Sequence, residues 1–428
     1  MEVNIYNLEI NGLNTLLIPM TKTDIVSVGM FIKVGSMNET KDNNGIAHFL
    51  EHLMFKSTVN RPNKKLLNAL DNLGTNYNAG TTRDHTYYEI NGAKKDINEI
   101  IDIIIDLYCN PVYEIDEIEL EKGVVLEEIK MYLDNSSRAM YDYIISEIFK
   151  GTPLEKNVTG NDKNIKKFTK EDITNFRKLY TIENSLLVIS GNFEKNEVID
   201  ILKENIKKNS FNHSKVDDVK INYKVNINSS KPNVYIIPNK NMNQSYLYIS
   251  FYFDKLTFME ECILNFLSFY LSTGSTSKLF EVLRNKLGAS YSYEVSLIDF
   301  KCESGLFYIY SNINNIQILD ALSEILKMLN DLKNENINDE DMKKVKKLVD
   351  TDNLFHINNP NYLMMYHGKK YLYGKKENIL EEVDIISKLD AKTIKDFCNS
   401  FFVKKNLNIF IYGTDIDASK TAKIVNEF

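Results

Sequence analysis

The 428-residue sequence repeats one order of predicted elements, and this duplication restricts the fold more than any other feature. In each half, an apolar strand that ends at a proline is followed by a second apolar strand. Each half then ends with a capped amphipathic helix, an apolar strand, a glycine and a last helix. The matching segments are residues 15–19 and 234–238, 25–32 and 246–251, 168–173 and 389–394, 186–191 and 407–413, and 195–206 and 418–426. We therefore expect two domains of the same fold.

The order of elements predicts the α+β class for both domains. Runs of strands and long helices without strict alternation are typical of helices packed on one face of a mainly antiparallel sheet. A polar segment rich in Asn, Ser, Lys and Asp separates the two halves, although residues 219–227 within it could form an extra strand. We place the N-terminal domain at residues 1–213, the linker at 214–230 and the C-terminal domain at 231–428.

The composition excludes several classes of function. A net charge of −7 without a basic patch argues against a nucleic-acid partner. The four cysteines are scattered and form no Cys-x-x-Cys pair, which argues against a disulfide framework and a thiolate metal site. We see neither a signal peptide nor an apolar run of the roughly 18 residues that span a bilayer. The sequence therefore predicts a cytoplasmic protein that does not bind membranes.

Residues 44–55 predict a helix with two histidines on one face. His48 and His52 are one turn apart, and Glu51 lies beside His52. Two imidazoles at this spacing can reach one metal ion about 2 Å from each nitrogen, and they leave the carboxylate free to handle a proton. The order His-x-x-Glu-His is the inverted zinc-peptidase motif. The alternative is that both histidines are capping or core residues, but the chain has only six histidines, which makes a chance match rare.

A zinc site used for hydrolysis needs a third protein ligand. The predicted helix at residues 119–131 offers Glu119, Glu121, Glu127 and Glu128. Glu121 and Glu128 are seven residues apart and share a face of this helix. Spacing alone does not choose between them, and each one taken alone is typical of an ordinary surface residue.

Residues 35–56, which contain the inverted motif, resemble the signature of the pitrilysin/insulinase family of zinc metallopeptidases. The similarity is to the short two-domain members related to mitochondrial processing peptidase, and residues 73–88 and 274–293 share it. The resemblance implies one zinc ion per chain, held by His48, His52 and Glu128. It also implies that Glu121 orients a ligand histidine. Two imidazoles and a carboxylate suit zinc, but the sequence does not exclude manganese or cobalt.

The resemblance also implies how a substrate is held. The backbone of an extended peptide would pair with an edge strand at Asn78, Ala79 and Gly80. Arg284 and Tyr291 would contact the substrate and stabilise the developing oxyanion. His85, beside this strand, is interpreted as an exposed strand-end residue and not as a ligand.

The family pattern further implies a clamshell of two domains that forms a homodimer. In such a dimer, Arg284 and Tyr291 of one protomer would complete the zinc site of the other. A heterodimer with a related chain is the variant of this prediction, although the intact set of motifs offers no need for one.

The sequence thus predicts a zinc-dependent endopeptidase that hydrolyses peptides or unfolded polypeptides bound in extended form, with Glu51 as the general base. The alternative is a non-catalytic peptide-binding or structural subunit of the same fold. We favour the peptidase because the sequence keeps both the zinc motif and the Arg/Tyr pair. The sequence does not separate a general oligopeptidase from a dedicated maturation peptidase.

Overall fold

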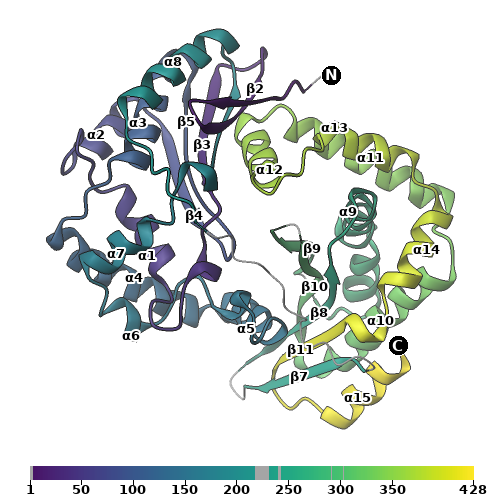
Figure 1. Ribbon diagram of the computed structural model, residues 1–428. Helices are drawn as coiled ribbons and strands as arrows, with labels where there is room; N and C mark the ends of the chain where they lie inside the picture. Colours follow the sequence, from purple (N-terminus) through teal and green to yellow (C-terminus); the bar gives the residue numbers. More distant parts are fainter. Residues whose placement is uncertain (1–2, 217–230, 240–241, 291, 302) are drawn as a thin grey trace. The chain divides into compact units, whose positions relative to one another are not determined.

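The structure is a computed structural model that describes residues 3–216, 231–239, 242–290, 292–301 and 303–428. The chain forms two compact units (Figure 1). The first unit comprises Met1–Val225 and Phe355–Asn378, and the second comprises Asn226–Leu354 and Ile379–Phe428. Most of the predicted linker, together with the possible extra strand at 219–227, lies outside the described residues.

The first unit is built on a six-stranded sheet with the order β1-β2-β6-β3-β5-β4. Its pairs are antiparallel except for β2 with β6, which is parallel. Within the described residues β4 pairs only with β5, so β4 is an edge strand. The strands are β1 (Tyr6–Ile10), β2 (Leu13–Pro19), β3 (Ile25–Ile32), β4 (Asn76–Thr81), β5 (Thr86–Ala93) and β6 (Ser185–Gly191).

The second unit repeats this topology in a five-stranded sheet with the order β7-β11-β8-β10-β9. The β7–β11 pair is parallel and the others are antiparallel. The series β7-β11-β8-β10-β9 thus corresponds, strand by strand, to β2-β6-β3-β5-β4 of the first unit. This correspondence confirms the predicted duplication and the mainly antiparallel sheets. The strands are β7 (Asn233–Pro238), β8 (Gln244–Asp254), β9 (Tyr293–Phe300), β10 (Ser304–Asn314) and β11 (Leu407–Gly413).

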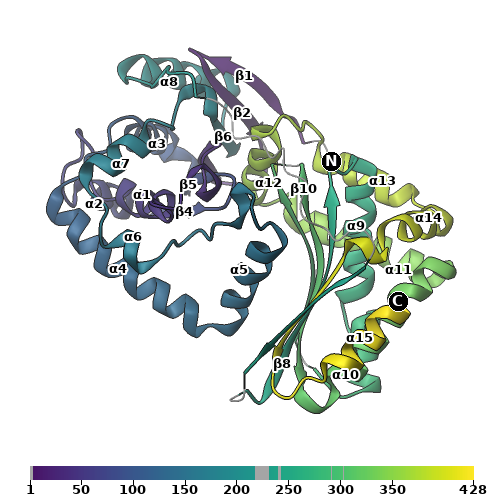
Figure 2. The ribbon, with the colours of Figure 1, turned by 60° about the horizontal axis from the view of Figure 1, so that its bottom comes forward.

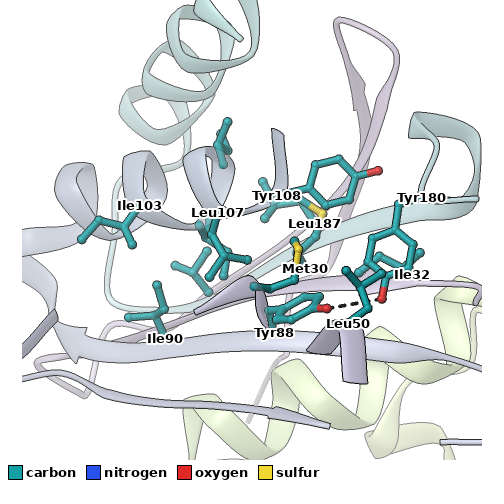
Figure 3. Close-up of a cluster of buried hydrophobic side chains, with 14 of the residues drawn as sticks. Met30, Ile32, Leu50, Tyr88, Ile90, Ile103, Leu107, Tyr108, Tyr180 and Leu187 are labelled. Carbon is teal, nitrogen blue, oxygen red and sulfur yellow. Dashed lines mark hydrogen bonds between the residues drawn. The ribbon is translucent and has the colours of Figure 1, made fainter. Parts of the chain in front are cut away.

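Apolar helix faces bury one side of each sheet. In the first unit, α3 (Ile97–Cys109) lies over β3 and β5, and Figure 3 shows Ile103 and Leu107 packed above Met30 and Ile90. In the second unit, α10 (Ile318–Asn334) packs on β8 and β10, and Figure 2 shows α10 and α15 (Ala418–Glu427) beside β8. Of the helices in the described residues, none combines the length and apolar character needed to cross a membrane.

The remaining helices include two whose capped starts were predicted. α7 (Lys170–Arg177) begins after Thr169 in a capping box, and α14 (Ala391–Phe401) begins after Asp390, whose side chain accepts from the Thr393 N–H. The others are α1 (Ile46–Met54), α2 (Lys65–Asn72), α4 (Ile115–Asp134), α5 (Ser136–Ile148), α6 (Asp162–Ile165), α8 (Lys195–Lys208), α9 (Phe258–Ser272), a π-helix (Phe280–Lys286), α11 (Asp339–His356), α12 (Pro360–Leu372) and α13 (Ile379–Lys388).

The prediction that helices cover only one face of each sheet is wrong for the first unit. α12, from the second half of the sequence, packs against β3 and β6. It meets the β3 face that carries Gly29 and Phe31, opposite the Met30 side under α3. Local periodicity indicates a helix here but not the sheet it covers. The predicted boundaries at 1–213 and 231–428 do not include this return of the chain.

We predict that Gly368→Ala destabilises the first unit by about 1–3 kcal/mol, because overpacking forces neighbours to move. A Cβ at Gly368 would lie 2.5 Å from the buried Phe31 ring. Gly123 on α4 is the matched control, because a Cβ there would meet nothing within 4 Å. Gly123→Ala should therefore raise stability by about 0.5–1 kcal/mol. Urea unfolding of both variants is the measurement, and a stabilised Gly368→Ala protein would contradict the close packing of α12.

Candidate metal centre

Helix α1 carries the inverted motif and is fixed by its apolar side. Phe49, Leu50 and Leu53 are buried in the core of the first unit. The helix begins after Gly45, whose φ of 101° lies in the left-handed region that glycine tolerates. Since glycine has no capping side chain, the carboxylate of Glu39 accepts hydrogen bonds from the backbone N–H groups of Gly45 at 2.9 Å and Ala47 at 2.8 Å. Burial raises the pKa of Glu39 to about 8, against the effect of these hydrogen bonds.

Three possible ligand atoms converge beside α1. The Nε2 atoms of His48 and His52 are 3.3 Å apart. Oε2 of Glu128, from α4, lies 3.3 Å from the His52 Nε2 and 3.7 Å from the His48 Nε2. Tetrahedral zinc with ligand bonds of about 2.0–2.2 Å separates its ligand atoms by about 3.3–3.6 Å. The spacing and the chemistry of these donors therefore fit zinc.

Glu121 fixes the orientation of His52. Its Oε1 lies 2.8 Å from the His52 Nδ1, and its Oε2 pairs with Lys56 Nζ at 2.6 Å. A proton on Nδ1 leaves the Nε2 lone pair directed at the cluster. Burial alone would raise the pKa of Glu121, but the hydrogen bonds from His52 and Lys56 outweigh burial and lower it.

The two histidines have different electrostatic surroundings. Burial opposes protonation of His52, yet its hydrogen bonds with Glu121 and Glu128 outweigh burial and raise its pKa to about 9. The cluster thus attracts a positive charge, which a metal ion also supplies. Burial, followed by the neighbouring His52, lowers the pKa of His48 and keeps that imidazole in the neutral form that binds metals. Among the described residues, the His48 Nδ1 has no hydrogen-bond partner.

Glu51 lies beside the cluster on α1 and is held by the edge strand. Thr81, the last residue of β4, donates a hydrogen bond from its hydroxyl to the Glu51 Oε2 at 2.8 Å. Burial raises the pKa of Glu51, and this hydrogen bond opposes the rise. A carboxylate with a raised pKa is better matched to proton transfer near neutral pH than an ordinary one.

The three residues predicted to contact the substrate backbone lie on β4. Asn78 is exposed, and Ala79 and Gly80 are half-buried. A side chain at Gly80 would place its Cβ 2.6 Å from the Tyr87 ring, so that ring would have to move. An open pocket of about 250 Å³ lies beside this strand, and its lining is Glu51, His52, Phe55, Lys56, Leu67, Tyr77, Asn78, Ala79 and Glu121.

Two further predicted site residues belong to the other half of the sequence. Arg284 lies in the π-helix of the second unit, with its guanidinium carbon 4.9 Å from the centre of the Phe280 ring. Tyr291 lies outside the described residues. The roles of both residues stay predictions, as do the roles assigned to the residues of the first unit.

The interpretation of His85 as an exposed residue is wrong. His85 is buried, and its Nδ1 lies 2.7 Å from the Asp84 Oδ1. The residues that sequence reasoning missed are Glu39, Lys56 and Thr81, each of which touches the metal helix or its partners. Their contacts join α1 or the residue after it to the preceding loop, to α4 and to β4, and no local pattern indicates them.

Comparison with known proteins shows the family to which the chain belongs. The family described as Insulinase (Peptidase family M16) matches residues 15–162, and that described as Peptidase M16 inactive domain matches residues 167–349. An "Uncharacterized zinc protease" of Rickettsia bellii is 30% identical over 404 residues, covering 92% of this chain and 93% of that protein. The chain therefore belongs to the insulinase family, peptidase family M16.

A second relative and a solved structure match different parts of this chain. Subunit 1 of the mouse mitochondrial cytochrome b-c1 complex is 33% identical over 181 residues, covering 42% of this chain and 38% of that protein. The crystal structure of a protease from Helicobacter pylori has a TM-score of 0.88 at 21% identity, covering 96% of this chain and all (100%) of that chain. The second comparison shows the shared two-domain fold.

We predict that His48→Ala abolishes binding of one zinc ion, because two remaining ligands do not hold zinc tightly. The matched control is His213→Ala, because His213 is exposed and outside the cluster. Metal analysis of both proteins after dialysis against zinc is the measurement. Equal zinc content in the two variants would contradict the assignment of the cluster.

Proposed function

We propose that the protein is a zinc-dependent endopeptidase that cuts peptides bound in extended form. The observation that carries this proposal is the convergence of His48, His52 and Glu128 at zinc-ligand spacing, next to a carboxylate held by an edge strand. The relative named as a zinc protease supports it over nearly the whole length of both chains.

The substrate class follows from the edge strand. Among the described residues, the outer side of β4 pairs with no other strand, and an extended peptide can pair with its backbone groups as an additional strand. Pairing at Asn78, Ala79 and Gly80 would hold the peptide beside Glu51, because Thr81 at the end of the same strand binds that carboxylate. A folded protein cannot offer a free strand easily, so we propose peptides or unfolded polypeptides as substrates.

The chain's own residues divide the chemistry between them. Zinc bound by three protein ligands supplies Lewis acidity and lowers the pKa of water. Glu51 would take the proton from the attacking water and deliver it to the leaving amine. Arg284 and Tyr291 would donate hydrogen bonds to the oxygen that becomes negative. Glu121 would keep His52 oriented throughout, because it holds the Nδ1 proton.

We also propose that two copies of the chain form the active enzyme. Arg284 belongs to the second unit, whereas the metal cluster belongs to the first. In the homodimer, Arg284 and Tyr291 of one protomer would act at the metal centre of its partner. An active monomer would contradict this arrangement.

The second candidate function is a non-catalytic peptide-binding or structural subunit. One relative carries the name of a subunit of the cytochrome b-c1 complex, and the family matched by residues 167–349 is described as an inactive domain. The complete donor set with Glu51 beside it favours the peptidase, because a purely structural subunit needs neither.

We predict that Glu51→Gln retains zinc and loses about 10²–10⁴-fold in the rate of peptide cleavage, because the amide cannot accept the proton. Cleavage of unstructured peptides, followed by mass spectrometry, measures the rate, and metal analysis checks the zinc. Thr81→Val serves as a milder variant that removes only the hydrogen bond to Glu51 and should retain part of the activity. A Glu51→Gln protein that cleaves at the wild-type rate would refute the role of Glu51.

We predict that mixing inactive Glu51→Gln and Arg284→Ala proteins restores cleavage. In a shared-site dimer, each mixed pair contains one site with an intact Glu51 and an intact Arg284. The measurement is peptide cleavage after the two proteins are unfolded, mixed and refolded together, compared with each protein refolded alone. If the mixture is no more active than the sum of its parts, the site is not shared between protomers.

A further inference from the structure

The turn that follows the metal helix is anchored to the end of α3. Residues 57–61 leave α1 and meet the α3 terminus, where the Val59 N–H donates to the Asn110 carbonyl at 2.9 Å. The Val112 N–H donates to the Ser57 carbonyl at 2.9 Å. Backbone hydrogen bonds therefore join the turn to the residues at and just after the end of α3.

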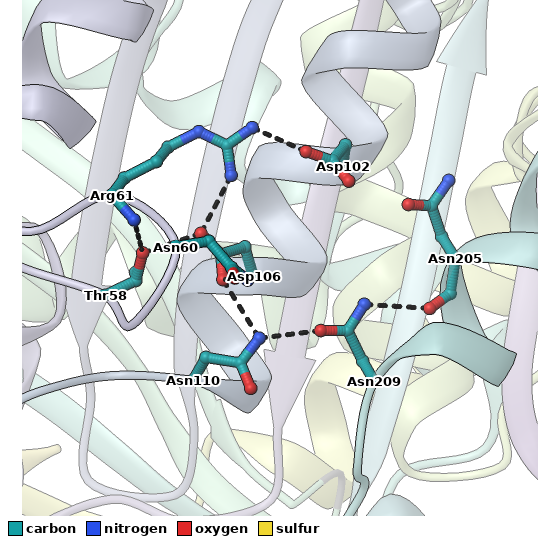
Figure 4. Close-up of polar contacts among 8 residues, drawn as sticks. All are labelled: Thr58, Asn60, Arg61, Asp102, Asp106, Asn110, Asn205 and Asn209. Carbon is teal, nitrogen blue, oxygen red and sulfur yellow. Dashed lines mark hydrogen bonds and ion pairs between the residues drawn. The ribbon is translucent and has the colours of Figure 1, made fainter.

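Asp106 lies at the centre of this anchor, as Figure 4 shows. Its side chain is 2% exposed, and each carboxylate oxygen accepts two hydrogen bonds. Oδ2 accepts from the Thr58 hydroxyl at 2.6 Å and from the Arg61 guanidinium at 2.8 Å. Oδ1 accepts from the side-chain amides of Asn60 at 2.7 Å and Asn110 at 2.9 Å. Three of the four donors come from the turn.

The position of Asp106 is unfavourable for a carboxylate by itself. It occupies the last turn of α3, where the helix dipole is negative and disfavours an anion. A buried carboxylate is also costly unless hydrogen bonds compensate for the lost water. The turn supplies three of these hydrogen bonds, so the conformation of residues 58–61 and the burial of the Asp106 carboxylate depend on each other.

The same turn contacts the helix that carries the third ligand. Lys56 pairs with Glu121 at 2.6 Å, and the Ser57 hydroxyl donates to the Glu117 Oε1 at 2.9 Å. Glu117 and Glu121 are neighbours one turn apart on α4. Glu121 in turn holds the His52 Nδ1. Contacts thus run without a gap from Asp106, through the turn, to a ligand histidine.

We propose that Asp106 is a positioning residue of the metal centre. By fixing the turn at residues 57–61, it sets Lys56 and Ser57 against α4 and holds Glu121 where it orients His52. This inference rests on the proposed zinc function and extends that site to a carboxylate on another helix. Substitution of residues that hold a metal ligand in place typically lowers metal affinity by about 10–100-fold.

The test is the zinc affinity of the full chain, measured by competition with a chelating indicator. Asp106→Asn should weaken zinc binding by about tenfold or more, because the amide presents a donor to the donors of the turn. Asp102→Asn is the matched control: Asp102 lies on the same helix and also pairs with Arg61, but its side chain is 45% exposed. We expect it to change the affinity by less than about twofold, as is usual for an exposed ion pair.

Two further variants separate positioning from general stability. Lys56→Met removes the contact with Glu121. The double variant Asp106→Asn/Lys56→Met should lose less zinc affinity than the product of the two single fold-losses, because both residues act through Glu121. If Asp106→Asn does not fold, Thr58→Val removes one donor to Asp106 and should weaken zinc binding in the same direction.

The outcomes distinguish the inference from the function on which it rests. If the wild-type protein binds zinc and either Asp106→Asn or Thr58→Val binds it equally well, only the positioning role is overturned. A lowered melting temperature of the metal-free Asp106→Asn protein with unchanged zinc affinity also overturns that role. Wild-type protein that does not bind zinc overturns the proposed function, and this inference with it.

Discussion

The packing of α1 against α4 is the interaction on which the metal centre depends. A nine-residue helix is too short to be stable alone, so α1 keeps its shape through its buried apolar side and its supported ends. Glu39 accepts hydrogen bonds from backbone N–H groups at the start of the helix, and the turn at residues 57–61 follows its end. Because α4 contributes both Glu121 and Glu128, a small shift between the two helices would separate the donors of the site.

The edge strand is tied to the same helix pair. Thr81 joins β4 to Glu51, so the strand proposed to bind the peptide and the base proposed to cleave it are positioned together. Protein interiors are close-packed and transmit displacements, so this arrangement is maintained by the whole core of the first unit. α12 contributes to it from the opposite face of the sheet, where glycines allow close approach to β3.

The parts of the fold and site that the sequence predicts are local ones. The Thr169 cap, the proline-ended strands and the one-turn spacing of His48 and His52 all lie within short segments. Glu128 is different, because spacing does not choose among several glutamates and only the family resemblance selects it. The structure brings it to the histidines because α4 buries Val125 and Ile129, which turns the Glu121–Glu128 side of the helix toward α1.

Contacts between distant segments could not be predicted in this way. The return of α12 to the first unit, the burial of His85 and the three hydrogen bonds that the turn donates to Asp106 depend on tertiary packing. The measurement that tests the zinc-dependent function most directly is a zinc titration of metal-stripped protein against a mixture of unstructured peptides. We predict no cleavage without zinc, and cleavage that saturates near one ion per chain. Cleavage that is equally fast in the stripped protein, or zinc-loaded protein that leaves every peptide intact, would contradict that function.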